Sequence, residues 1–230
     1  MAAALQRVCA MVAAGGVHHV VTLNAEMAVL ATRDAEFGDI VRAADMVVPD
    51  GAGIVWAAKV LGRRLPARVA GYDLMLAIAG LAAERGEAVF LLGGRPGIAD
   101  TAAKALCARY PELRVAGTHH GYFAGAESGV IADAVNKSGA TYLFVALGAP
   151  KQEKWIAEHK AALAPGVKVC MGVGGSFDVL AGVVARAPDW AGRMGLEWLY
   201  RLVTQPRRAG RMLALPRFAY AVLLTRLKTR

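Results

Sequence analysis

Short apolar runs alternate with longer stretches of helical periodicity along most of this chain of 230 residues. An apolar run bounded by Gly or polar residues is typical of a buried strand, and apolar positions three and four apart are typical of a helix. The predicted strands are 19–22, 46–49, 88–92, 114–118, 141–146 and 167–171. The predicted helices are 1–16, 34–44, 72–85, 98–109, 128–137 and 151–162. This alternation predicts an α/β fold with a mostly parallel, Rossmann-like sheet and helices on both faces.

The pattern changes after Gly172, where a Gly-rich loop follows the last predicted strand. Farther on, Pro206 and Pro216 separate basic pieces of helical character. We therefore expect an α/β catalytic core over residues 1–190 and a basic helical C-terminal appendage over residues 191–230.

Charge is concentrated at one end of the chain. The formal net charge is +9, and residues 201–230 contribute +8 of it, because they contain eight basic residues and no acidic one. Such asymmetry indicates an anionic partner for the appendage, which could be membrane lipid, a diphosphate or nucleic acid.

Cysteine usage and hydropathy indicate a cytoplasmic, peripheral protein. The three cysteines, Cys9, Cys107 and Cys170, form no CxxC pair, which argues against a disulfide framework and against a zinc site. The apolar N-terminus lacks the basic region of a signal peptide, and no apolar run reaches the ~18 residues of a membrane span.

Polar residues that follow the predicted strands are the candidates for chemistry, because ligands bind beyond the carboxyl ends of parallel strands. Asp50 follows the second strand and precedes two nearby glycines, so we predict that it is a general base. The alternative is that Asp50 only caps a helix that begins near Gly53.

A Gly-rich turn over residues 93–97 follows the third strand and includes Gly93 and Gly94. It suits a phosphate at a helix N-terminus, or it is a tight turn that needs positive φ angles. No GxGxxG or Walker A pattern is present.

Two neutral side chains, Asn24 and Gln152, follow predicted strands and can donate and accept hydrogen bonds with sugar hydroxyls or a uracil edge. The alternative is that they are only loop or helix-cap residues. The pairs at 18–19 and 119–120 are His-His, and we expect them to be structural or at the surface, since adjacent strand residues point to opposite faces.

The chain has no DxD triplet to bind a metal–diphosphate complex, so arginines are expected to neutralise any diphosphate. The alternative for the arginines of the appendage is that they form a solvated basic face and bind no diphosphate. The candidates are Arg68, Arg193, Arg201, Arg207, Arg208 and Arg211.

Seven segments carry a resemblance to a known family. In chain order they are VVTLNAEM, VVPDGAGIVWAAKVLG, RVAGYDLM, FLLGG, LFVALGAPKQEKWI, GVGGSFDVLAG and RAPDWAGRMGLEWLYRLVTQPRR. Together they resemble the WecG/TagA/CpsF family of bacterial glycosyltransferases over residues 20–211. TLNAE here replaces the commoner TPNPE of that family.

The resemblance implies an inverting, metal-independent glycosyltransferase that needs no cofactor. It would move N-acetylmannosamine, its uronic acid or glucose from a UDP-sugar to a polyprenyl-diphosphate-linked acceptor in cell-surface polysaccharide biosynthesis. The expected place is the cytoplasmic face of the inner membrane, where the appendage would meet an anionic surface. Homo-oligomer formation is left open.

The resemblance also implies residue roles. Three residues are expected to be catalytic: Asp50 matches the proposed base, and Thr22 and Asn24 match a polar motif of the first strand. Arg68 and Gln152 match further substrate-binding positions. The other expected substrate contacts are Gly93, Gly94, Gly174, Phe177 and Asp178. The arginines expected to lie over the diphosphate or at the membrane are Arg193, Arg201, Arg207, Arg208 and Arg211.

Other classes of protein fit less well. A non-transferase that binds a nucleotide, a nucleotide-sugar or NAD on a similar sheet lacks support from a dinucleotide fingerprint. A nucleic-acid-binding module would interleave aromatic and basic residues, whereas the appendage embeds its aromatic residues in apolar helix. A non-catalytic membrane adaptor would not need Asp50.

Overall fold

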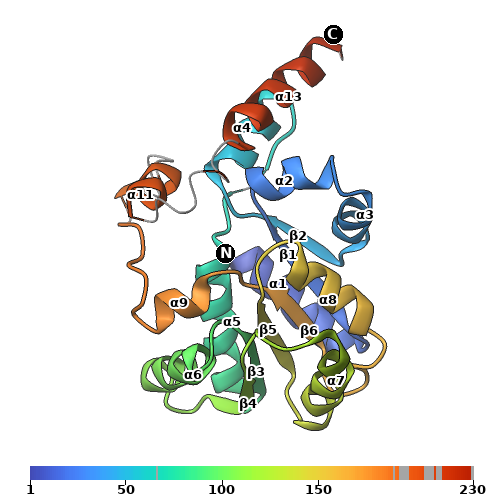
Figure 1. Cartoon of the computed structure of the whole chain (residues 1–230), viewed down its shortest axis with the longest axis vertical. Coiled ribbons are helices and arrows are strands. Elements are labelled where there is room, and N and C mark those ends of the chain that lie inside the picture. Colours follow the sequence, from blue (N-terminus) through green and yellow to red (C-terminus); the bar gives the residue numbers. More distant parts are fainter. Residues whose placement is uncertain (66, 189, 192–196, 205–209, 211–213, 229–230) are drawn as a thin grey trace.

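A parallel six-stranded sheet forms the centre of the computed structural model of this chain, counted over the residues that the structure describes (Figure 1). These residues are 1–65, 67–188, 190–191, 197–204, 210 and 214–228. The strands are β1 (His18–Leu23), β2 (Met46–Pro49), β3 (Ala88–Gly93), β4 (Arg114–His119), β5 (Tyr142–Ala146) and β6 (Val169–Gly172). Their order is β2-β1-β6-β5-β3-β4, and every pair is parallel. The predicted α/β fold is therefore confirmed.

The inner strands β3, β5 and β6 are apolar and buried because both of their faces are covered, whereas the edge strand β4 is partly exposed. In β3, Val89 and Leu91 belong to one buried cluster, whereas Phe90 and Leu92 belong to the cluster on the other face. In β5 the same alternation places Tyr142 and Phe144 in the first cluster and Leu143 and Val145 in the second.

Helices cover each face of this sheet. One face packs against α1 (Ala2–Ala14), α5 (Gly71–Arg85), α6 (Ile98–Arg109) and α9 (Ser176–Leu180). The other packs against α2 (Ala25–Ala31), α3 (Ala35–Ala43), α7 (Ser128–Lys137) and α8 (Lys151–His159). The remaining elements are α4 (Ala52–Val60), η1 (Gly125–Glu127), α11 (Glu197–Thr204) and α13 (Ala214–Lys228).

Several elements of the structure were not predicted, among them α9, where the sequence analysis expected a loop. The stretch that follows β1 forms α2, which the sequence analysis did not predict, and its N-cap is Asn24. The helix predicted over 151–162 ends at His159, and hydrogen-bonded turns continue from there to Gly166.

The C-terminal helix α13 packs against α2 and α4 at one end of the molecule (Figure 1). Its buried residue is Val222, and Phe218 lies 3.7 Å from the position that a Cβ on Gly53 would take. No helix in the described part of the chain is both long and apolar enough to traverse a bilayer. The boundary near residue 190 stays a prediction.

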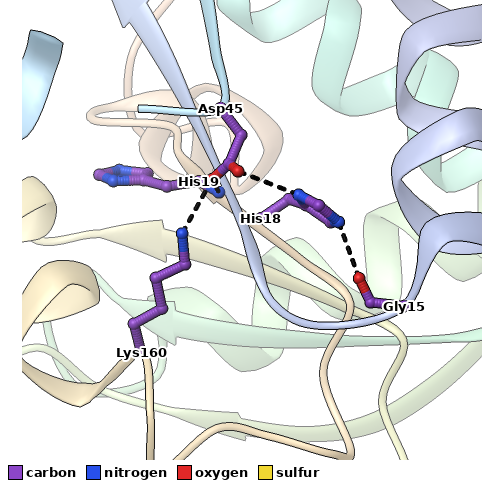
Figure 2. Close-up of polar contacts among 5 residues, drawn as sticks. All are labelled: Gly15, His18, His19, Asp45 and Lys160. Atoms are coloured by element: carbon purple, nitrogen blue, oxygen red, sulfur yellow. Dashed lines mark hydrogen bonds and ion pairs between the residues drawn. The ribbon is translucent and has the colours of Figure 1, made fainter. Parts of the chain in front are cut away.

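A polar cluster joins β1 to the segments that follow α1, precede β2 and follow α8, at the amino end of β1 and opposite the edge where the candidate residues lie (Figure 2). Asp45 accepts hydrogen bonds from the His19 backbone N–H at 2.8 Å and from Lys160 Nζ at 2.9 Å. His18 Nδ1 lies 3.1 Å from Asp45 Oδ1, and its Nε2 lies 2.9 Å from the Gly15 carbonyl oxygen. The His18 ring therefore has a structural role here, and His19 takes part through its backbone N–H.

The ionisation of Asp45 in this cluster makes the stability of the fold depend on pH. Burial alone would raise the pKa of Asp45, but hydrogen bonds from His19, Lys160 and His18 lower it to about 2. Because this pKa is lower in the folded chain than in the unfolded chain, the ionised carboxylate stabilises the fold above pH ~3.9. That stabilisation is lost as the pH falls through about 2.

We therefore predict that Asp45→Asn lowers the melting temperature at pH 7 by about 4–8 °C, since the hydrogen bonds of a charged group contribute about 2 kcal/mol. The difference from the wild type should shrink between pH 4 and pH 2, measured by circular dichroism. A difference that stayed constant over this range would contradict the assigned role of the carboxylate.

Candidate active site

Asp50 lies at the carboxyl edge of the sheet, directly after β2, and is half-buried. Its backbone N–H donates to the Leu23 carbonyl oxygen at 2.9 Å, which joins the ends of β1 and β2. Its Oδ1 accepts a hydrogen bond from the Gly71 N–H, at the start of α5, at 3.0 Å. Gly51 rather than Asp50 is the N-cap of α4, and the Asp50 side chain binds instead the first residue of α5.

Thr22 lies beside this carboxylate network and is buried. Its Oγ1 donates to the Gly172 carbonyl oxygen at 3.2 Å, which connects β1 to the end of β6. A Cβ on Gly71 would lie only 3.0 Å from Thr22 Cγ2, so α5 begins in close contact with Thr22. Asp50, Gly71, Thr22 and Gly172 therefore form one continuous set of contacts.

Gln152 is buried in the first turn of α8 and makes three hydrogen bonds within the protein. Its Oε1 accepts from the Gly148 N–H at 3.1 Å and from the Gly174 N–H at 3.0 Å. Its Nε2 donates to Glu153 Oε1 at 2.7 Å. Gln152 thus connects the loop after β5 to the loop after β6, and the predicted substrate contact stays a prediction.

Glu153 is a buried acid that the sequence analysis did not select. Its side chain has no exposed surface, and burial raises its pKa above the usual range because the hydrogen bond from Gln152 does not offset the desolvation. The signal that could have identified it is its position, next to Gln152 in the GAPKQE segment.

The Gly-rich turn after β3 is a tight turn with positive φ angles, as one of the two interpretations predicted. Gly93 has φ +132°, and a Cβ there would collide with the backbone of Ala146. The Gly94 N–H donates to the Ala146 carbonyl oxygen at 3.0 Å. Gly97 is the N-cap of α6, and the binding of a phosphate at this end stays a prediction.

Other predicted contacts have structural roles in the described residues. Asn24 Oδ1 accepts from the Met27 N–H at 3.0 Å and so caps α2. Phe177 is buried in the core, and the Asp178 carbonyl oxygen accepts from the backbone N–H groups of the residues at 183 and 184. Gly174, at φ +52°, directs its N–H to Gln152. Whether these residues also bind substrate stays a prediction.

The predicted arginines are only partly described. Arg68 is half-buried. The next residue, Val69, donates its N–H to the Pro49 carbonyl oxygen at 2.9 Å, so the backbone at Arg68 lies near the end of β2. Arg201 lies in α11, and its side chain is outside the description. Outside the described residues lie Arg193, Arg207, Arg208 and Arg211.

The segment that leads from α9 toward the appendage is held at the start of α5. Arg186 forms an ion pair with Asp73 at 2.8 Å, and its guanidinium lies 4.9 Å from the centre of the Tyr72 ring. Asp73 is two positions from Gly71, the residue that binds Asp50. Arg186 is therefore held at the N-terminal end of α5, the same end at which Gly71 binds Asp50.

Comparison with known proteins identifies the family of this chain. The Glycosyl transferase WecG/TagA/CpsF family matches residues 1–230. The chain is 35% identical over 202 residues to the N-acetylglucosaminyldiphosphoundecaprenol N-acetyl-beta-D-mannosaminyltransferase of Bacillus subtilis (strain 168), a match that covers 88% of this chain and 77% of that enzyme. Proteins of the same name from Bacillus spizizenii and Staphylococcus aureus (strain MRSA252) are each 36% identical and cover 89% and 88% of this chain, and 78% of each relative. The chain belongs to the WecG/TagA/CpsF family of glycosyltransferases.

Proposed function

We propose that this glycosyltransferase moves N-acetylmannosamine from its UDP donor to N-acetylglucosamine carried on a polyprenyl diphosphate. The names of relatives that are 35–36% identical support this choice of donor sugar and acceptor. The uronic acid of N-acetylmannosamine and glucose are the alternative donor sugars. The reaction is inverting and metal-independent, and it serves cell-surface polysaccharide biosynthesis.

The observation that carries this proposal is the position of Asp50 in a chain of this family. A half-buried carboxylate follows β2 at the edge of the sheet where α/β proteins bind ligands. The Gly71 N–H holds its Oδ1 at 3.0 Å and thereby fixes its orientation. A base must be oriented in this way to take a proton from an acceptor hydroxyl.

In the proposed reaction, the acceptor hydroxyl attacks the anomeric carbon from the face opposite UDP. The new C–O bond forms while the bond from that carbon to the β-phosphate oxygen breaks, and the hydroxyl proton passes to Asp50. The electron pair of the broken bond leaves with UDP. Arg68 and the appendage arginines, among them Arg201 and Arg207, would stabilise the developing negative charge.

UDP release with purified full-length protein tests this function. The assay uses a short-chain N-acetylglucosaminyl-diphosphate lipid, EDTA, and UDP-N-acetylmannosamine, its uronic acid, UDP-glucose or UDP-N-acetylglucosamine as donor. We expect acceptor-dependent release with UDP-N-acetylmannosamine and an inverted anomeric configuration by NMR. Release that stops in EDTA would contradict the metal-independent mechanism, and preference for another donor would reassign the sugar.

A substitution at Gly71 tests the contact between α5 and the base. An added Cβ would lie 3.0 Å from Thr22 Cγ2 and 3.2 Å from Thr22 Oγ1, so α5 or Thr22 must shift by a few tenths of an ångström. We predict that Gly71→Ala lowers kcat by about tenfold, because small displacements of catalytic groups are costly. Gly129→Ala is the control, since its Cβ would meet nothing within 4 Å, and an equal loss in both variants would contradict the prediction.

We also propose that α13 lies on the anionic cytoplasmic face of the inner membrane. One side of α13 packs against α2 and α4, yet a second apolar stripe with helical spacing is exposed. The stripe consists of Tyr220, Leu223, Leu224 and Leu227, with exposed fractions of 65%, 49%, 37% and 69%. Such an exposed stripe on a basic helix without acidic residues fits the interface of a bilayer, where the lipid-linked acceptor resides.

A further inference from the structure

The carboxamide of Gln152 has only one orientation that satisfies its surroundings. Two backbone N–H groups, those of Gly148 and Gly174, point at the same atom from distances of 3.1 Å and 3.0 Å. Only an acceptor can meet two donors, so this atom is the carboxamide oxygen. The amide nitrogen must then face the opposite way, where it needs an acceptor of its own.

Glu153 provides that acceptor. Its Oε1 receives the Gln152 Nε2–H at 2.7 Å, and Glu153 Oε2 has no hydrogen-bond partner among the described residues. In that part of the chain, no basic side chain lies within ion-pair distance of Glu153. The buried carboxyl therefore has one described side-chain partner, the carboxamide of Gln152.

Gly172 fits closely over this pair. A Cβ on Gly172 would lie 2.5 Å from Gln152 Nε2 and 2.8 Å from Glu153 Oε1, so the end of β6 rests directly on the two side chains. The Gly172 carbonyl oxygen also accepts from Thr22 Oγ1 at 3.2 Å. Thr22 in turn contacts Gly71, which holds Asp50.

We propose that Glu153 is a positioning residue of the transferase that acts through Gln152, fixing its carboxamide so that the loops after β5 and β6 are held in place beside Thr22 and Asp50. The proposal rests on the proposed function. It assigns to the GAPKQE segment the task of joining two loops, with Glu153 as acceptor and Gln152 as the bridge.

The charge of Glu153 is not required for this role, because accepting one N–H bond needs only a carbonyl oxygen. Glu153→Gln keeps such an oxygen, whereas Glu153→Met has a similar length and no acceptor. We therefore expect kcat of Glu153→Gln to stay within about threefold of the wild type. For Glu153→Met we expect a loss of about tenfold or more, with the KM for the donor changed less than kcat, because the loop positions rather than a substrate contact are altered.

Amide hydrogen exchange of the full-length protein gives a readout that does not depend on activity. In Glu153→Met the Gly148 and Gly174 amides should exchange about tenfold faster than in the wild type, and in Glu153→Gln they should stay protected. The control is Ile156→Ala, one turn farther along α8 at a fully buried position that makes none of these hydrogen bonds. It should lower the melting temperature without selectively exposing the two loop amides.

Three results would overturn the inference. The first is wild-type kcat and protection in Glu153→Met, and the second is an equal loss in Glu153→Gln and Glu153→Met. The third is a selective loss of Gly148 and Gly174 protection in Ile156→Ala as well. If the wild type transfers no sugar from any donor, the proposed function fails, while the exchange of the two amides still decides whether Glu153 holds the loops.

Discussion

Asp50→Asn is expected to lower kcat by about 10²–10⁴-fold, which is the usual contribution of a general base. Asn has nearly the same shape as Asp, and its carbonyl oxygen can still accept the Gly71 N–H that now lies 3.0 Å from Asp50 Oδ1. The variant should therefore fold normally and keep the positions of α5 and Thr22. It cannot take the proton of the acceptor hydroxyl, so the loss should fall on the chemical step.

The measurement is steady-state UDP release, combined with calorimetric titration of UDP into each protein. We expect the Kd for UDP to change by less than about threefold, because an interaction made only in the transition state does not affect ground-state binding. Asp39→Asn serves as the control for loss of one carboxylate, since Asp39 lies on the exposed side of α3 and pairs with Arg42. Retention of kcat in Asp50→Asn would rule out the base, and a large loss of UDP affinity would assign Asp50 to donor binding instead.

The inner strands β3, β5 and β6 were predictable because they are buried on both faces. Runs such as Tyr142–Ala146 carry apolar side chains at every position, and the signal does not depend on distant contacts. By contrast, α2 has seven residues and follows β1 immediately, so its short Ala-rich sequence shows little periodicity of its own. Its capping by Asn24 was one of the interpretations that the sequence allowed.

The network of the candidate site was less accessible to sequence reasoning, because its contacts join residues that are far apart in the chain. The edge on which Asp50 lies follows from the strand pattern, and Asp50 itself was selected on that basis. Its hydrogen bond to Gly71 spans 21 positions, and that from Thr22 to Gly172 spans 150. No local spacing indicates such pairs. Glu153 was missed for a different reason, since a Glu in the first turn of a helix is ordinarily exposed and favourable there.

Replacement of the basic residues of α13 with Gln is expected to weaken binding to anionic vesicles by roughly 10²-fold. The variant changes Arg217, Arg226 and Lys228, each of which should contribute about 1 kcal/mol near an anionic surface. Three such contributions give ~3 kcal/mol, and each 1.4 kcal/mol corresponds to a factor of ten. Binding of the wild type should weaken further as salt is raised, because these interactions are screened.

The matched control removes the same charge from the opposite end of the molecule, by Lys104→Gln, Arg109→Gln and Lys137→Gln in α6 and α7. Co-sedimentation with phosphatidylglycerol vesicles and with purely zwitterionic vesicles separates the contribution of charge to binding from that of the apolar stripe.

A third variant, Leu223→Ser with Leu227→Ser, should lower binding to both kinds of vesicle, since these leucines are 49% and 69% exposed and would enter the interface. Equal losses in the two charge variants would show that net charge, rather than α13, directs binding. The helix α13 packs against α2 and α4. These two helices begin directly after Asn24 and Gly51, and Gly51 is adjacent to Asp50. A membrane-bound α13 would therefore bring the candidate site toward its lipid-linked acceptor.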